Sequence, residues 1–460
     1  MKKNDVFEAE ITGMTLQGAG IARCEGAPVF VPAACTGDFI RATVTKMKDG
    51  YGYGRLQSVL RPAPARVVPD CAVFPKCGGC AFQHIAYAAE LALKERELRE
   101  TLRRIGKIEI PLRPILGAQS AERYRNKAML PLRRDGEAVE AGFFARHSHR
   151  IVPCVDCRLA PESFARLAKA VCEWVRETNC TLYDDENGRG LLRQLYLRQN
   201  RAGSQVLVTL VIHGEGIPRA DRLICALRSA DKAVCGVLLN HNSKPGNTLL
   251  GGRCTVLWGG DTITDSLCGL EFRLSPLSFF QVNPAQTERL YAIAADYALQ
   301  ALPAGKTLRL LDLYCGTGTI GLSVLAQLRG RAHCRLIGVD CADSAIADAK
   351  RNAENNGLGA YAHFICADAA DAAVQLRAEG WQPDVILIDP PRKGCEPALL
   401  HTIEAMRPAR IVYISCDPAT LARDLAMLQA LGYAAREAVP VDMFPRTGHL
   451  ESVTWLERCF

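Results

Sequence analysis

The residue best placed to act as a nucleophile in this chain is Cys416. It follows a short apolar run, RIVYIS, and precedes Asp417-Pro418 and the helical stretch ATLARDL, so we expect it between the end of a strand and the start of a helix. The positive end of a helix dipole favours the thiolate, which is the reactive form of cysteine. Such a thiolate can bond transiently to an electron-poor carbon. Most cysteines are small buried hydrophobes, so this interpretation depends on the elements around it.

A second chemical motif, Asp389-Pro390-Pro391, directly follows the apolar run VILI. Open α/β sheets bind ligands at the carboxyl ends of their parallel strands, where both this carboxylate and Cys416 are expected. In methyltransferases a proline-rich turn at this place shapes the gap between the methyl donor and the target base. Enzymes that methylate exocyclic amines resemble one another in having an aromatic residue after the prolines, whereas this chain has Arg392. The motif therefore favours a carbon or another target over an amine.

A glycine-rich turn supplies a candidate cofactor site. Gly316, Gly318 and Gly321 form a G-x-G-x-x-G pattern between the strand LRLLDLY and a helix, and Asp340 ends the next expected strand. Glycines let the backbone approach a ligand, and the carboxylate can hold two ribose hydroxyls. NAD and S-adenosylmethionine would both satisfy this pattern. The Asp389 motif favours S-adenosylmethionine.

Methylation at carbon 5 of a uracil would require two reactive groups. Carbon 5 is a poor nucleophile until a thiolate adds at carbon 6 and turns the ring into an enolate. After methyl transfer, a base must remove the proton from carbon 5. The terminal segment offers His449 and Glu451 for this step, and their spacing does not choose between them.

A group of cysteines near the N-terminus predicts a metal centre. Cys71, Cys77 and Cys80 follow a C-x5-C-x2-C spacing, and the segment VPCVDCRL offers Cys154 or Cys157 as a fourth thiol. Clustered thiolates in a cytosolic protein are typical of a metal ion or an iron–sulfur cluster. Zinc held by four thiolates is the main alternative to a cluster.

The elements that position these residues fall into three parts. Residues 1–60 read as short strands with glycine turns, which predicts a small β-barrel. Four prolines between Arg61 and Asp70 mark a boundary, and residues 61–275 mix strands and helices, beginning with an amphipathic helix over 86–105. In residues 276–460 apolar strands alternate with helices, which indicates a doubly wound parallel sheet.

Composition limits the class of protein. A chain of 460 residues with 48% hydrophobic and 23% charged residues is expected to form several folded domains. The net charge of +7 permits contact with phosphates. No run of about eighteen apolar residues and no signal core is present, so the sequence predicts a cytoplasmic protein that does not contact a membrane.

Taken together, five motifs resemble the RNA uracil-5-methyltransferase family. They are FFQVNPAQTE, LDLYCGTGTIG, IDPPRKG, YISCDPATLARDL and FPRTGHLES, in the order of the family and over residues 278 to 452. Residues 1–60 are similar to the TRAM domain, an RNA-binding barrel of the oligonucleotide-binding type. The resemblance implies a Rossmann-like class I methyltransferase domain preceded by this barrel and by an α/β middle domain.

The resemblance also implies roles for individual residues. It makes Cys416 the nucleophile and Glu451, rather than His449, the base. It implies contacts with S-adenosylmethionine at Gln281, Tyr314, Asp340 and Asp389. The ribosomal RNA branch of the family carries a [4Fe-4S] cluster, which implies the ligands Cys71, Cys77, Cys80 and Cys157. Cys157 is preferred to Cys154 because the residues after it match the family motif better.

We therefore predict an enzyme that methylates a uridine of 23S ribosomal RNA. A transfer RNA methyltransferase, a non-catalytic iron–sulfur RNA-binding protein and a pyridine nucleotide oxidoreductase are the alternatives. Candidate RNA contacts in the barrel are Lys46, Lys48, Tyr51, Tyr53 and Arg55. Candidates in the middle part are Arg123, Arg125, Lys127, Arg146, His149 and Arg150, although ordinary solvated charge accounts equally well for any one of these residues.

Overall fold

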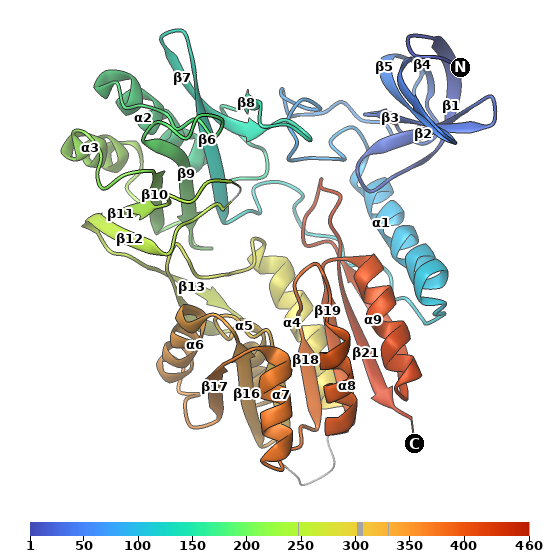
Figure 1. Cartoon of the computed structure of the whole chain (residues 1–460), viewed down its shortest axis with the longest axis vertical. Helices are drawn as coiled ribbons and strands as arrows, with labels where there is room; N and C mark the ends of the chain where they lie inside the picture. Colours follow the sequence, from blue (N-terminus) through green and yellow to red (C-terminus); the bar gives the residue numbers. More distant parts are fainter. Residues whose placement is uncertain (247, 301–306, 330, 460) are drawn as a thin grey trace.

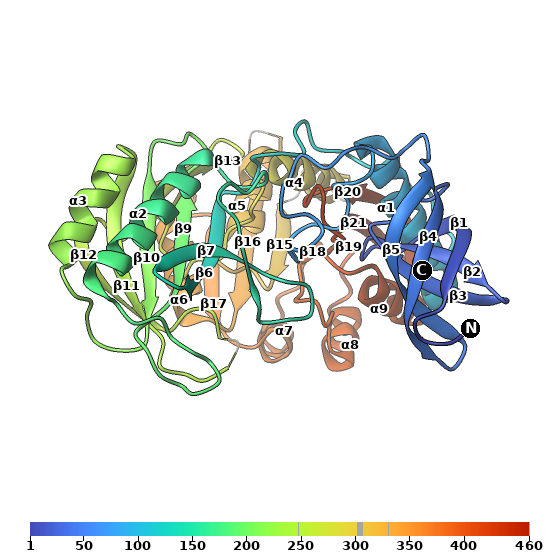
Figure 2. The same ribbon diagram turned by 90° about the horizontal axis from the view of Figure 1, so that it is seen from above.

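The computed structural model describes residues 1–246, 248–300, 307–329 and 331–459 (Figure 1). Seen from above, an N-terminal barrel and a middle sheet lie at opposite ends of the molecule, with the C-terminal sheet between them (Figure 2). Within the described ranges, no helix is both long and apolar enough to cross a bilayer.

The N-terminal strands close into a barrel in the order β1-β2-β3-β5-β4. Alternate residues point inward, and Ile11, Val29, Ile40 and Val44 fill its core. The strands are β1 (Val6–Met14), β2 (Ala19–Cys24), β3 (Ala27–Pro32), β4 (Phe39–Lys48) and β5 (Tyr51–Arg61).

A helix follows the barrel and the cysteine-rich segment. This helix, α1 (Tyr87–Thr101), continues into a π-helical turn, η1 (Leu102–Gly106). Leu98 and Leu102 are buried in the same core as helix α9 (Pro418–Ala430) of the C-terminal part. Helix α1 thus packs on the C-terminal sheet layer although it lies early in the chain.

The middle part is a seven-stranded sheet in the order β12-β11-β10-β9-β6-β7-β8, with two helices packed on it. Only β10 and β11 pair in parallel. The strands are β6 (Lys127–Asp135), β7 (Ala138–Phe144), β8 (Ile151–Pro153), β9 (Leu192–Gln199), β10 (Val206–Ile212), β11 (Val234–His241) and β12 (Arg253–Gly259). The helices are α2 (Glu162–Thr178) and α3 (Ala220–Ala230). A separate hairpin follows, formed by β13 (Ile263–Leu267) and β14 (Leu270–Leu274).

The C-terminal sheet has the order β17-β16-β15-β18-β19-β21-β20. The strands are β15 (Leu308–Leu313), β16 (Cys334–Asp340), β17 (Ala362–Cys366), β18 (Val385–Ile388), β19 (Arg410–Ser415), β20 (Tyr433–Val441) and β21 (Glu451–Arg458). Strands β15 to β19 are parallel, as the alternating pattern predicts. Strand β21 runs antiparallel to both of its neighbours, so the sheet is mixed at this end.

Helices cover both faces of this sheet. One apolar core holds α4 (Pro284–Leu299), α5 (Thr319–Leu328) and α6 (Asp343–Asn355). The opposite core holds α7 (Ala369–Ala378), α8 (Pro397–Met406) and α9. Continuous apolar strands such as β18 and β19 are buried on both sides, as expected for parallel strands in this position. The carboxyl ends of the parallel strands are therefore the open edge at which polar side chains can gather.

Candidate active site

Three of the predicted residues meet at this open edge. Asp389 follows β18, Cys416 follows β19 and Glu451 begins β21. The strands are neighbours, because Ile388 pairs with Tyr413 and Ser415 pairs with Ser452. Adjacent strand ends therefore carry the carboxylate, the thiol and the second carboxylate.

The surroundings of Cys416 favour its protonated thiol. Burial, with added repulsion from the carboxylates of Glu451 and Asp389, raises the pKa of Cys416 to about 11. The expectation that the helix N-terminus would favour the thiolate is therefore wrong for the free protein. The N-terminus of α9 is capped by Asp417, which accepts hydrogen bonds from the backbone N–H groups of Ala419 and Thr420.

The two carboxyl groups also hold protons tightly. Burial and the neighbouring Asp389 raise the pKa of Glu451 well above its usual range, and burial raises the pKa of Asp389 to about 7. The guanidinium of Arg392 opposes the shift at Glu451 and also lowers the pKa of Cys416. Once ionised, a carboxylate with a raised pKa is a stronger base toward a carbon acid.

His449 contacts Arg392 and Phe444 in the site. Its Nδ1 lies 3.2 Å from the Nη2 of Arg392, and its ring meets Phe444 edge-on at 5.8 Å between centroids. Burial and the charge of Arg392 lower the pKa of His449 to about 4, so the ring is neutral and can accept from the guanidinium. The charges that shift the pKa of Cys416 are those of Glu451, Asp389 and Arg392.

The glycine turn between β15 and α5 adopts the conformation that its sequence predicts. Gly316 and Gly318 have φ values of 55° and 79°, in the left-handed region that favours glycine. Asp340, at the end of β16, accepts hydrogen bonds from the N–H groups of Gly316 at 3.0 Å and Ala342 at 2.9 Å. Each carboxylate oxygen keeps a lone pair for a ligand hydroxyl.

Gln281 and Tyr314 flank this turn. Tyr314 immediately precedes it with a φ of 65°, and burial raises its pKa. Gln281 belongs to the segment before α4, in which the carbonyl of Phe279 accepts from the hydroxyl of Thr317 at 3.3 Å. The segment therefore closes over the glycine turn, and all four predicted cofactor residues border one edge of the sheet.

Two groups with shifted pKa values beside the site were missed or misjudged from the sequence. Asp312, inside β15, accepts the N–H of Gly321 at 2.9 Å, and burial raises its pKa to about 8. Lys127 was expected to face RNA or solvent, but its Nζ donates to the carbonyl of Phe280 at 2.8 Å, and burial lowers its pKa to about 7. A lysine opening a strand that reads as apolar, KAMLPL, is the only sequence signal for this burial.

The predicted metal-binding cysteines gather around one cavity. Its lining includes Cys71, Cys77, Cys80, Cys154 and Cys157. Burial raises the pKa of both Cys80 and Cys154 to about 12. In the described part of the chain, no three acidic, histidine or cysteine side chains converge as ligands of a single metal ion.

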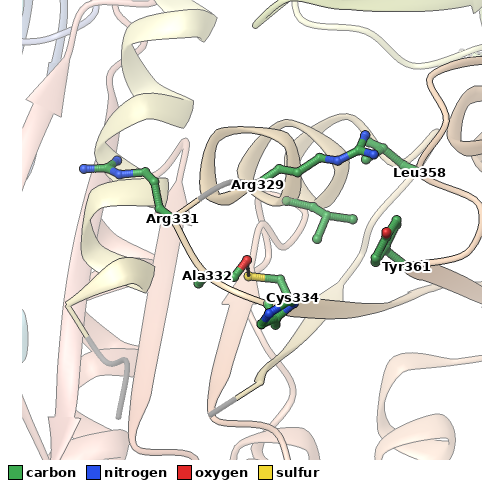
Figure 3. Close-up of a pocket in the computed structure, with 8 residues that line it drawn as sticks. Arg329, Arg331, Ala332, Cys334, Leu358 and Tyr361 are labelled. Atoms are coloured by element: carbon green, nitrogen blue, oxygen red, sulfur yellow. Dashed lines mark hydrogen bonds between the residues drawn. The ribbon is translucent and has the colours of Figure 1, made fainter. Parts of the chain in front are cut away.

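A separate hollow of about 410 Å³ lies away from this chemistry (Figure 3). It is lined by Arg329, Cys334 and Tyr361, among others. Cys334 begins β16, whereas Asp340 ends it, so this hollow belongs to the opposite edge of the sheet from the glycine turn.

Comparison with known proteins identifies the family. The family model described as tRNA (Uracil-5-)-methyltransferase matches residues 268–459, and the TRAM domain model matches residues 2–56. A protein of Halalkalibacterium halodurans named as an uncharacterized RNA methyltransferase is 41% identical over 458 residues, which cover 99% of this chain and 98% of that protein. The chain belongs to the RNA uracil-5-methyltransferase family. A Clostridium tetani protein of the same name is 37% identical over 453 residues, covering 98% of this chain and 96% of that protein.

A solved structure carries the same fold. The tRNA (uracil-54, C5)-methyltransferase of Pyrococcus abyssi, in complex with S-adenosyl-L-homocysteine, matches with a TM-score of 0.76 and 25% identity, covering 98% of this chain and 100% of that chain. The class I methyltransferase fold and the N-terminal TRAM barrel predicted from the sequence are confirmed. This chain is therefore an S-adenosylmethionine-dependent RNA methyltransferase, and the oxidoreductase alternative is excluded.

Proposed function

We propose that the protein methylates carbon 5 of a uridine in 23S ribosomal RNA through a covalent bond between Cys416 and carbon 6 of the ring. The observation that carries this proposal is the meeting of Asp389, Cys416 and Glu451 on adjacent strand ends beside the glycine turn. A thiol and a strongly basic carboxylate are the two groups that the reaction requires.

The residues act in sequence. The Cys416 thiolate adds to carbon 6, and the displaced electron pair moves onto the ring as an enolate with high density at carbon 5. Bound S-adenosylmethionine supplies an electrophilic methyl group, which that carbon takes. Glu451 then removes the proton of carbon 5, and the returning electron pair expels the thiolate of Cys416. Gln281, Tyr314, Asp340 and Asp389 are the residues that we assign to holding the methyl donor.

The proton on Cys416 must leave before the first step. Because the pKa of the thiol is raised to about 11, the site depends on positive charge to stabilise the thiolate, and Arg392 is the cation whose charge lowers that pKa. A bound uracil also excludes water, which strengthens every charge interaction in the site.

A trapping experiment tests the mechanism. RNA containing 5-fluorouridine has no proton at carbon 5 to surrender, so a covalent complex of protein and RNA should accumulate and survive denaturing electrophoresis. Cys416→Ala should abolish this band and the transfer of labelled methyl groups. Cys225→Ala, which changes an exposed cysteine on α3, is the matched control and should behave like the wild type. A band that persists in Cys416→Ala would refute the nucleophile.

The choice of ribosomal RNA rests on the cysteine cavity together with the barrel, because the ribosomal branch that the sequence resembles has both. Transfer RNA is the second candidate, favoured by the family model and by the Pyrococcus abyssi enzyme, both named for transfer RNA. Incubating the protein with labelled methyl donor and either 23S ribosomal RNA or total transfer RNA separates the two. Label in transfer RNA alone would overturn the ribosomal assignment.

We also propose that Cys71, Cys77, Cys80 and Cys157 bind a [4Fe-4S] cluster. A zinc ion needs its sulfurs about 2.3 Å from a single point. Each iron of a cubane cluster takes one thiolate, so the sulfurs surround a wider space. Five thiols line one cavity, which supports a thiolate arrangement of this wider kind. The cluster would supply a structural crosslink, since the reaction transfers no electrons.

Iron and acid-labile sulfide analysis after anaerobic purification tests this assignment. We expect about four irons per chain in the wild type, loss of the cluster in Cys157→Ser and its retention in Cys154→Ser. Loss of the cluster only in Cys154→Ser would show that Cys154, rather than Cys157, is the fourth ligand. One zinc per chain without sulfide would show that the site binds a single zinc ion and no cluster.

A further inference from the structure

The loop that delivers Glu451 to the active site joins β20 to β21 and spans residues 442–450. In Figure 1 it rises from the C-terminal sheet toward the segments that follow the barrel. Its first residue, Asp442, is fully buried and accepts hydrogen bonds from the Nζ of Lys94 at 2.7 Å and the hydroxyl of Tyr87 at 2.7 Å. Lys94 is also fully buried and lies 2.8 Å from the carboxylate of Glu90. One end of the loop is thus tied to helix α1 by a buried ion network.

The middle of the loop is held by Arg446, whose backbone and side chain both engage residues of the same early segment. Its N–H donates to Glu90 Oε1 at 2.8 Å, and its Nη1 donates to the carbonyl of Ile85 at 2.9 Å. Its carbonyl accepts from the N–H groups of Ala81 at 2.7 Å and Phe82 at 3.1 Å. These residues directly follow Cys80, so the cysteine-rich segment and the catalytic loop share hydrogen bonds.

The backbone at Arg446 is strained in a way that its side chain explains. Its φ of 67° lies in the left-handed region, which is unfavourable for a residue other than glycine. A glycine would remove that strain and keep the backbone hydrogen bond to Glu90, but it would lose the side-chain hydrogen bond to Ile85 and the ion pair with Glu90. The turn directs the chain to Gly448, where an added Cβ would lie 2.1 Å from the carbonyl oxygen of Leu16 in the barrel. Three residues later the chain reaches Glu451.

We propose that Arg446 is a positioning residue that holds the loop so that the carboxylate of Glu451 reaches the proton on carbon 5. The inference rests on the proposed function and extends it, because it assigns to the segment from Ala81 to Lys94 the task of aligning the base. Among the described residues, no hydrogen bond joins Asp442, Lys94 or Arg446 to Cys416, although His449 of the same loop contacts Arg392 and β21 pairs with β19. The hydrogen bonds of Asp442 and Arg446 are therefore separate from the contacts of Cys416 and bear more directly on Glu451.

This separation gives a specific kinetic signature. Trapping on 5-fluorouridine RNA needs the Cys416 step and methyl transfer but no removal of a proton. Arg446→Ala should therefore form the trapped complex within about threefold of the wild-type rate. Turnover on ordinary uridine should fall about 10- to 100-fold with KM for RNA changed less than about threefold, because only the later step is slowed. A methylated covalent intermediate should accumulate on ordinary RNA.

Control variants distinguish positioning from general damage. Arg436→Ala removes an exposed arginine from β20 that pairs with Glu457, and it should retain wild-type kinetics. Arg446→Lys keeps a cation near Glu90 and should recover part of the lost turnover. Tyr87→Phe deletes only the hydroxyl that reaches Asp442, so it should show the same signature more weakly and serves if Arg446→Ala does not fold.

Equal slowing of trapping and turnover in Arg446→Ala and Tyr87→Phe would overturn the inference, as would turnover unchanged from the wild type. Failure of the wild-type protein to trap 5-fluorouridine RNA would instead overturn the proposed function. The two failures are therefore distinguishable in one set of gels.

Discussion

At the scale of single residues, the site brings together a thiol, which we propose as the nucleophile, and the carboxyl group that we propose as the base. Cys416 lies among the carboxyl groups of Asp389 and Glu451, with Arg392 as the cation that opposes their effect. The raised pKa of Cys416 favours its protonated form, which reacts more slowly with oxidants and alkylating agents than the thiolate does. Its reactivity must then depend on pH and on the charge of Arg392.

The rate of covalent addition should rise with pH. Because the pKa of Cys416 is raised to about 11, only a small thiolate fraction exists at neutral pH, and it grows about tenfold per pH unit below that value. Single-turnover trapping on 5-fluorouridine RNA should therefore accelerate about tenfold per unit between pH 7 and 9. A rate that is flat over this range would mean that the thiol is already ionised.

Removal of the Arg392 charge should slow the same step. In Arg392→Ala the pKa of Cys416 rises further, so trapping at pH 8 should fall about tenfold and recover in part at higher pH. Arg392→Lys retains a positive charge and should fall less. Lys393→Ala, which changes a neighbouring cation paired with Glu396, is the control and should leave the trapping rate unchanged.

At the scale of secondary-structure elements, a buried carboxyl group links strand β15 to helix α5. Asp312 Oδ2 accepts the N–H of Gly321, while Oδ1 has no hydrogen-bond partner among the described residues. A side chain at Gly321 would place its Cβ 2.7 Å from this carboxylate, so the helix approaches the strand as closely as glycine allows. This close packing fixes the turn that carries Gly316 and Gly318.

Asp312 should make the free energy of unfolding depend on pH. Its pKa is raised to about 8 in the folded protein, against about 3.9 in an unfolded chain, so the folded state binds the extra proton between these values. The contribution of Asp312 to the free energy of unfolding is complete below about pH 4. It is lost as the pH rises toward 8, by up to about 1.4 kcal/mol per pH unit. In denaturant unfolding measured at several pH values, the free energy of unfolding of Asp312→Asn should lack this dependence on pH. An identical slope in both proteins would contradict the assignment.

At the scale of the whole molecule, the early half of the chain is built against the catalytic loop. The barrel meets it at Gly448, the segment after the cysteines at Arg446 and helix α1 at Asp442. The same barrel presents an aromatic cluster of Phe30, Tyr51 and Tyr53, with ring centroids about 6 Å apart. RNA held by the barrel would thus be held by a part in direct contact with the catalytic loop.

The exposed ring of Tyr53 should contribute to RNA affinity without affecting chemistry. Stacking of a base on an aromatic side chain is worth about 1–3 kcal/mol, so Tyr53→Ala should raise KM for RNA about 5- to 150-fold and leave kcat within about twofold. Val6→Ala, which changes an exposed apolar residue of β1, is the matched control. A fall in kcat with KM unchanged would show that Tyr53 of the barrel does not contribute to RNA binding.

The sequence alone determined the strand ends and the chemistry expected there. Asp340, Asp389 and Cys416 each follow an apolar run, and parallel strands bring their carboxyl ends to one edge whatever else the chain does. The family motifs fixed the fold class because several of them occur in order. Local pattern and chain direction were sufficient for these predictions.

Only the tertiary structure decided the charge states and the long-range supports. Lys127 is half-buried against the distant residue Phe280, and the raised pKa of Cys416 comes from its burial and from carboxylates on other strands. Lys94 and Asp442 are paired although 348 residues separate them, and Arg446 meets Ala81 across a similar distance in the chain. Such contacts depend on how whole layers stack, and a one-dimensional pattern carries no record of which distant residues will share a buried site.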